Sequence, residues 1–189
     1  ETVNYTTASF KATRVINLHS LENMSGGELD IRISHRFGFI NGGIYELYGL
    51  DESTIRLGAD YGITDRLMIG AGRSSYEKTY DGFVKFKLLR QSTGAKNTPI
   101  TLAFMSSMAI KTIKPSDPDR ENYFSNNLFY TCQLIMRRKL SDAFSLELAP
   151  TLVHRNLVET SAEENDVFAL GAGGRIKLSK RVSLNAEYI

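Results

Sequence analysis

The feature that most constrains the fold is an alternation of apolar and polar residues with period two, which starts at Leu29 and returns along the rest of the chain. In the first segment, LDIRISHRFGF, aliphatic and aromatic residues occupy odd positions, while Asp30, Arg32 and Arg36 occupy even ones. A helix would place Arg32, Arg36 and Phe39 on one stripe and so mix charge into its apolar face. The pattern therefore predicts a β-strand.

The same alternation predicts eight more strands. Most have about the ~9–11 residues that a tilted strand needs to cross a bilayer, whereas strands of soluble proteins are commonly nearer ~5–6. The segment 99–113 is apolar on both sides in places and is assigned by its Thr and Ile content, with Thr101, Ala103, Ser107 and Lys111 as its polar face. The eight strands are expected near residues 55–63, 67–72, 84–88, 99–113, 127–137, 144–155, 168–178 and 182–188.

The connections alternate in length. Three are tight turns of similar sequence, at residues 63–66, 140–143 and 178–181. Longer polar connections lie between them, at 41–53, 75–79, 114–122 and 158–165, and one expected short turn, 88–100, is longer than the scheme requires. Short turns at one end and long loops at the other are typical of outer-membrane barrels. The sequence thus predicts an all-β fold, an antiparallel up-and-down transmembrane β-barrel.

Composition limits the alternatives. No apolar run is long enough for a membrane helix, and a net charge of +2 gives no reason to expect nucleic acid as a partner. The single cysteine, Cys132, suits a small apolar strand position. Neither a His-Glu-x-x-His nor a Gly-x-Ser-x-Gly motif is present, so we expect no catalytic residues, no metal site and no cofactor.

The chain divides at a Gly-Gly pair. Residues 1–27 lack clean alternation and are interpreted as an N-terminal lead-in, a short strand or a plug folded into the lumen, while residues 28–189 carry the barrel strands. Nine strands is an odd number, whereas single-chain bacterial barrels normally have an even number and close on themselves. We therefore expect a barrel that is incomplete in this chain, with further strands beyond Ile189.

Seven long, non-repetitive stretches of the chain carry a family resemblance: ISHRFG (33–38), NGGIYELYGLD (41–51), TIRLGADYGITDRLMIGAGRSSYEKTYDG (54–82), FKLLRQSTG (86–94), PTLVHRNLV (150–158), NDVFALGAGGR (165–175) and KRVSLNAEY (180–188). They resemble an uncharacterised outer-membrane β-barrel family, a domain of unknown function, from Bacteroidetes bacteria. The resemblance implies a barrel in the bacterial outer membrane and a chain that continues past the equivalent of Ile189, but it implies no reaction.

If the apolar faces meet lipid, the opposite faces line the lumen with four acidic and ten basic residues. This excess of bases has two interpretations: a pore or site that prefers anions, or a filled interior in which charged side chains cross-link the wall. The lumen-lining candidates are Asp30, Arg32, Arg36, Arg56, Asp60, Lys85, Lys87, Lys111, Arg137, Glu147, Arg155, Arg175, Lys177 and Glu187.

For function the sequence favours a non-enzymatic protein of the bacterial outer membrane. It is either a porin-like small-solute conduit with a basic lumen or a structural component of an envelope complex. Outer-membrane lipid is the expected partner, and the second role adds other envelope proteins as partners. The alternative is a soluble lipocalin-like ligand-binding barrel, whose apolar faces would point inward. The direction in which Arg32 and Arg56 point separates the two.

Overall fold

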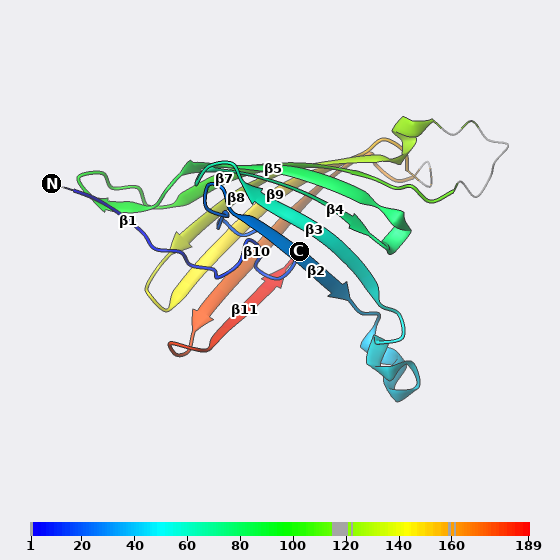
Figure 1. Cartoon of the computed structure of the whole chain (residues 1–189), viewed down its shortest axis with the longest axis horizontal. Coiled ribbons are helices and arrows are strands. Elements are labelled where there is room, and N and C mark those ends of the chain that lie inside the picture. The colour runs from blue at the N-terminus through cyan, green and yellow to red at the C-terminus, as the bar shows by residue number, and fades with distance from the viewer. Residues whose placement is uncertain (1, 115–120, 122, 159, 161) are drawn as a thin grey trace.

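The computed structural model describes residues 2–114, 121, 123–158, 160 and 162–189, and its main element is one antiparallel sheet of nine strands. The strands follow one another in space as they do along the chain, apart from the short β6 (Figure 1). They are β2 (Leu29–Arg36), β3 (Thr54–Gly62), β4 (Leu67–Ser74), β5 (Tyr80–Leu89), β7 (Thr101–Ile110), β8 (Leu128–Lys139), β9 (Phe144–Arg155), β10 (Asp166–Lys177) and β11 (Ser183–Tyr188). All nine match predicted strands, so the up-and-down β fold is confirmed.

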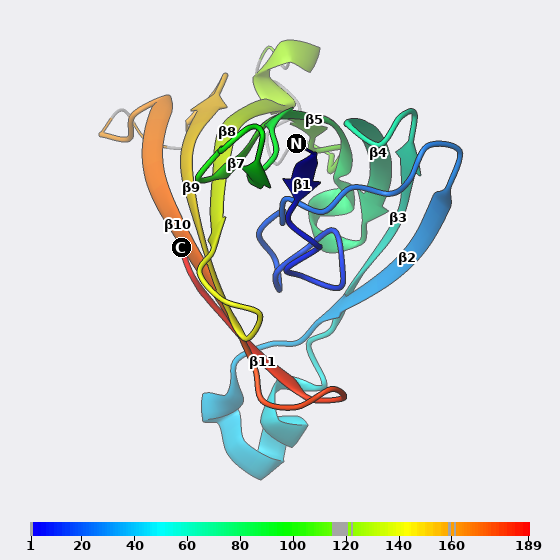
Figure 2. The ribbon, with the colours of Figure 1, turned by 90° about the vertical axis from the view of Figure 1, so that its left-hand side faces the viewer.

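The sheet is strongly curved and open. Figure 2 shows β8–β10 on one side and β2–β4 on the other, with the N-terminal part of the chain between them. In the described residues β2 and β11 are the two edges of the sheet and do not pair with each other. An open sheet agrees with the expectation of an incomplete barrel.

The tight turns share one construction. Thr64 Oγ1 accepts hydrogen bonds from the backbone N–H groups two and three residues later, at 3.2 and 3.0 Å. Ser141 and Ser179 do the same in their own turns, at the same pair of distances. The recurring hydroxyl residue therefore closes each turn by a side-chain bond to the backbone.

The longer turn at residues 90–100 has a separate explanation. It contains β6 (Ser92–Gly94), which pairs antiparallel with β1 (Val3–Tyr5). The additional residues of this turn therefore form a strand that pairs with residues 3–5 at the short-turn end. At the other end lie the 3-10 segments η1 (Ile40–Gly49), η2 (Tyr76–Lys78) and η3 (Phe124–Asn127), and most of the predicted loop 114–122 lies outside the described residues.

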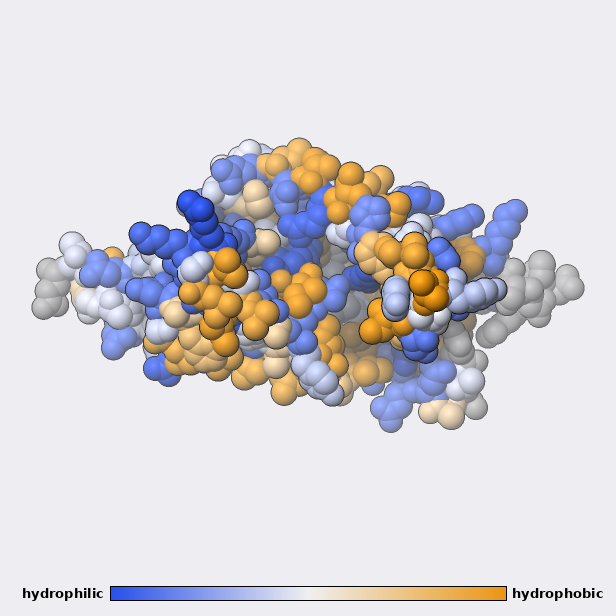
Figure 3. Space-filling view, turned by 90° about the horizontal axis from the view of Figure 1, so that it is seen from below, coloured by the Kyte–Doolittle hydropathy of each residue, from blue (hydrophilic) through white to orange (hydrophobic). Residues whose placement is uncertain are grey.

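The two faces of the sheet differ as the alternation predicts. Ile31 and Leu148 on the convex face are 66% and 46% exposed, whereas Lys85 and Glu147 on the concave face are fully buried. Viewed from below, hydrophobic residues flank a central hollow in which hydrophilic residues are visible (Figure 3). A lipocalin-like barrel requires the reverse arrangement, so the structure does not support that alternative.

None of the helices in the described part of the chain is long and apolar enough to cross a membrane.

The buried apolar residues lie on the concave side, where residues 6–27, here called the inner segment, pack against the sheet. Leu21 is fully buried in one cluster, and Phe10, Val15 and Leu18 belong to a second with Ala149 of β9. The sheet, here called the wall of the concavity, contributes residues from four strands to the first cluster: Met68, Phe83, Ala103, Met105 and Ile135. Full burial of a leucine side chain contributes about 1.5–3 kcal/mol, so Leu21 is a main anchor of the inner segment.

Candidate functional site: the occupied concave face

The inner segment forms a small hairpin within the curve of the sheet (Figure 2). The backbone N–H of Val15 donates to the carbonyl of Leu18 at 2.9 Å, and the N–H of Ser20 donates to the carbonyl of Thr13 at 3.0 Å. Arg14 and His19 form an antiparallel bridge between these bonds. This hairpin, with residues 21–24 after it, receives most of the hydrogen bonds between the inner segment and the wall.

Glu187 of β11 binds the tip of the hairpin through its carboxylate. The backbone N–H groups of Ile16, Asn17 and Leu18 all donate to it, over distances of 2.8–3.1 Å. Three consecutive N–H groups that converge on one carboxylate form an anion-binding concavity of the backbone. The tip of the hairpin is thereby fixed to an edge strand of the sheet.

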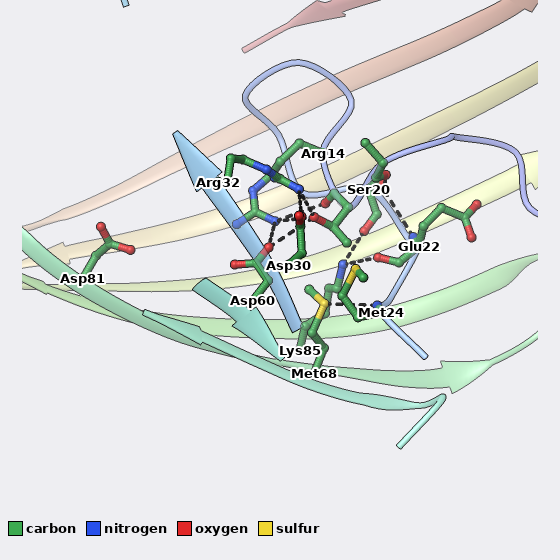
Figure 4. Close-up of polar contacts among 12 residues, drawn as sticks. Arg14, Ser20, Glu22, Met24, Asp30, Arg32, Asp60, Met68, Asp81 and Lys85 are labelled. Carbon is green, nitrogen blue, oxygen red and sulfur yellow. Dashed lines mark hydrogen bonds and ion pairs between the residues drawn. The ribbon is translucent and has the colours of Figure 1, made fainter. Parts of the chain in front are cut away.

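Lys85 and Glu147 bind residues 20–22 from the middle of the wall. Lys85 Nζ donates to the carbonyls of Ser20 at 2.8 Å and Glu22 at 2.6 Å (Figure 4). Glu147 Oε2 accepts from the N–H of Leu21 at 3.2 Å. Hydrogen bonds to charged groups contribute about 1.5–3 kcal/mol each, so these contacts offset part of the cost of burying the two charges.

Ion pairs and hydroxyl contacts complete the binding of the hairpin. Asp60 of β3 accepts from Thr13 Oγ1 at 3.2 Å and pairs with Arg14 at 3.4 Å (Figure 4). Arg32 of β2 donates to the same Thr13 hydroxyl at 2.9 Å and to Asp30 at 2.7 Å. Arg32 therefore points toward the inner segment rather than outward.

Arg137 of β8 forms an ion pair with Glu22 and so connects residues 20–22 to that strand. The same guanidinium also donates to Thr101 Oγ1 of β7 at 3.2 Å. Arg175 of β10 donates to the carbonyl of Ser9. With these contacts, side chains from β2–β5 and β8–β11 all hydrogen-bond to the inner segment.

Within the described part of the chain, the other predicted lumen residues form no hydrogen bonds to the inner segment. Arg56 of β3 pairs with Asp81 of β5, and Arg36 is exposed at the end of β2. Lys111 pairs with Glu77 at 2.9 Å and Arg155 with Glu163 at 3.2 Å, both near the long-loop end. Lys87 and Lys177 line two cavities at the short-turn end.

The electrostatic environment of the hairpin is basic. Burial lowers the pKa of Arg14 to about 10, and Asp60 opposes this shift. Burial also lowers the pKa of His19 well below 6.5, and the neighbouring charges of Arg14 and Lys85 lower it further. The His19 ring packs edge-on against Phe83 with ring centroids 4.5 Å apart, so a neutral imidazole suits its surroundings.

Two cavities lie on either side of Thr7 and Ala8. The first, of about 240 Å³, is lined by the inner segment and by residues from β8 to β10, among them Lys139, Arg175 and Lys177. The second, of about 300 Å³, lies toward β5 and is lined by Lys87, Arg90 and Arg137. Both lie beside the strand ends where the chain enters the concavity.

Five residues of the site were not predicted from the sequence: Thr13, Arg14, Ser20 and Glu22, which the wall binds, and Asp81. The inward position of Phe83, Met105 and Ile135 beside charged neighbours was not predicted either. Apolar residues at polar positions of the alternation were the available signal, because a water-filled lumen gives no reason for them. Gly171 and Gly173 gave a second signal: a Cβ there would lie 2.9 Å from Leu18 Cδ1 and 3.3 Å from Val15 Cγ2.

Comparison with known proteins identifies a family for this chain. A family model described as "Membrane bound beta barrel domain (DUF5777)" matches residues 10–189. The matched range includes most of the inner segment. No curated protein and no solved structure matches the chain.

Proposed function

Because the chain belongs to the family of membrane-bound β-barrel domains, we propose that it is a non-enzymatic conduit for small solutes in the bacterial outer membrane, closed at rest by its own inner segment. The observation that carries this proposal is the binding of the inner segment by charged wall residues. A lumen that serves only as packing gains little from fully buried ionic groups, since apolar residues of the same size stabilise as well or better. Charged contacts to a backbone are suited to a segment that is held and released.

Two features support the outer membrane as the location. The strands are antiparallel with an apolar convex face, and the short turns gather at one end while the longer loops lie at the other (Figure 1). Lipid is accordingly the proposed partner of the convex face, with the short turns in the periplasm.

The test is the conductance of the protein in planar bilayers, with Leu21→Arg as the opening variant. Leu21 is fully buried in an apolar cluster with Met68 and Ile135, so an arginine cannot dock there and the inner segment leaves the wall. We expect no steady current from the unmodified protein and a steady current from Leu21→Arg. Ile16→Arg is the matched control, because Ile16 is 56% exposed on the same hairpin, and it should remain closed.

A disulfide supplies the reverse experiment. A Cβ at Gly173 lies 3.3 Å from Val15 Cγ2, so cysteines at 15 and 173, with Cys132→Ser, are placed to form a bond. Added to Leu21→Arg, the oxidised pair should restore the closed state and a reductant should reopen it. If protease digestion shows that Leu21→Arg has released the segment while the bilayer stays silent, the conduit proposal is wrong.

One observation favours a structural role in an envelope complex as a second candidate. The connection that contains η1 exposes Phe39, Ile40, Ile44 and Tyr45, each by 76% or more. Exposed apolar groups of this kind are typical of interaction sites. Replacing Ile44 and Tyr45 by serine should then reduce the size of the complex that gentle detergent extracts, measured by size-exclusion chromatography, and an unchanged size would exclude this role for η1.

A further inference from the structure

The first cavity at the short-turn end has the composition of an oxyanion site. Its lining carries three cationic side chains, Lys139, Arg175 and Lys177, against the single carboxylate of Asp142. Hydroxyl residues Thr7, Ser9 and Ser145 also line it. Ammonium, guanidinium and hydroxyl groups are the donors that bind phosphate and carboxylate oxygens in proteins.

The cationic groups are not all used by the fold. Lys139 Nζ is shared between Asp142 Oδ1 and Thr7 Oγ1, each at 2.9 Å, and Arg175 donates to the carbonyl of Ser9. Among the described residues Lys177 forms no ion pair. A cation on the inner side of β10 with no carboxylate partner in this part of the structure is available to a dissolved anion.

Ser9 gives an independent indication. The residue is only 3% exposed, and its Oγ has no hydrogen-bond partner in the described part of the chain. A buried hydroxyl without a partner costs free energy, so its position in the lining of a basic cavity indicates a ligand that accepts its hydrogen bond. Ser145, 4% exposed, lines the same cavity from β9.

We propose that this cavity binds a small dissolved oxyanion, a phosphate or carboxylate group, between the inner segment and β8–β10. The cavity lies on the concave side of the sheet and is partly lined by the inner segment, so the source of the anion is a solute rather than a lipid headgroup. The proposal names the solute class of the conduit and in that respect rests on the proposed function, although binding itself requires no transport.

The experiment is a calorimetric titration of the protein with inorganic phosphate in a non-ionic detergent, at constant ionic strength with chloride as the replaced anion. We expect saturable binding that Lys177→Gln weakens roughly tenfold and Ser9→Ala weakens roughly threefold, as expected for the loss of a charged and of a neutral hydrogen bond. Lys180→Gln is the matched control, because Lys180 is exposed in the adjacent turn and does not line the cavity. The phosphate affinity of Lys180→Gln should equal that of the unmodified protein.

The remaining outcomes decide against the proposal. No saturation, or an equal loss in Lys177→Gln and Lys180→Gln, would show only general attraction to a basic surface. Competition by nanodiscs of anionic lipid, absent with zwitterionic lipid, would reassign the cavity to a headgroup. Phosphate binding by the unmodified protein, together with no current from Leu21→Arg, would support the site and exclude the conduit. A current from Leu21→Arg without phosphate binding by the unmodified protein would support the conduit and exclude the site.

Discussion

Single residues of the wall show what the alternation can predict and what it cannot. Lys85 and Glu147 were assigned to the inner face because they occupy polar positions of their strands, and both are fully buried on that face. Their partners are backbone groups of residues 20–22, and period-two alternation carries no information about a segment that lacks it. The alternation therefore identifies a face but not the chain that covers it.

The buried His19 predicts that the binding of the inner segment is sensitive to pH. Its pKa is lowered by burial and by Arg14, Lys85, Arg56 and Arg32, so the docked imidazole stays neutral where a released one binds a proton. A lowered pKa of this kind leaves docking at full strength above about pH 6.5 and weakens it as the pH falls, by up to about tenfold per pH unit.

The measurement is the mobility of a spin label at position 16, in the Cys132→Ser background, between pH 7.5 and 5. The mobile fraction should rise with acidity, and His19→Gln should abolish that rise. His35→Gln is the control, because His35 lies exposed on the convex side of β2 and should leave the pH profile unchanged. A profile that persists in His19→Gln would assign the sensitivity to another group.

At the scale of elements, the nine strands follow from local pattern, while the inner segment and the β1–β6 pair do not. Strands of three residues are too short to show alternation, and the hairpin of residues 13–20 forms by contact with the wall rather than by its own preference. Asp81 was missed for a related reason: it follows Tyr80 at the very start of β5, where the sequence resembles the preceding loop. Elements that are stabilised by distant contacts therefore cannot be predicted from the local sequence pattern.

The last four residues of the inner segment, 24–27, here called the link to β2, pack against Gly62 at the end of β3. A Cβ at this position would lie 2.1 Å from the carbonyl oxygen of Ser25 and 2.6 Å from that of Met24, and both are backbone atoms. Gly62→Ala should therefore displace the link and destabilise the protein by about 1–3 kcal/mol, as overpacking does. The measurement is the urea midpoint in detergent micelles. Gly82→Ala is the control, since its Cβ would meet only Gly70 O at 3.6 Å, and equal midpoints for the two variants would contradict the steric account.

At the scale of the whole molecule, the inner segment connects the two open edges of the sheet. Its hairpin contacts β2 through Arg32 and β11 through Glu187, and these strands lie at opposite ends of the strand order. Strand twist alone curves a sheet, but it does not fix the separation of two unpaired edges. The segment thus acts as an internal brace across the concavity.

The brace predicts that the edge separation depends on docking. Spin labels at Ile31 of β2 and Leu184 of β11, both exposed on the convex face, report that distance in the Cys132→Ser background. The distance distribution should be narrow in the otherwise unmodified protein and broad in Leu21→Arg, while Ile16→Arg should leave it narrow. Glu187→Gln should broaden it less than Leu21→Arg, because a neutral amide oxygen still accepts from the hairpin tip while the charge that strengthens those bonds is lost. A narrow distribution in all variants would mean that the strands alone set the curvature and that the inner segment has no effect on the separation of the edges.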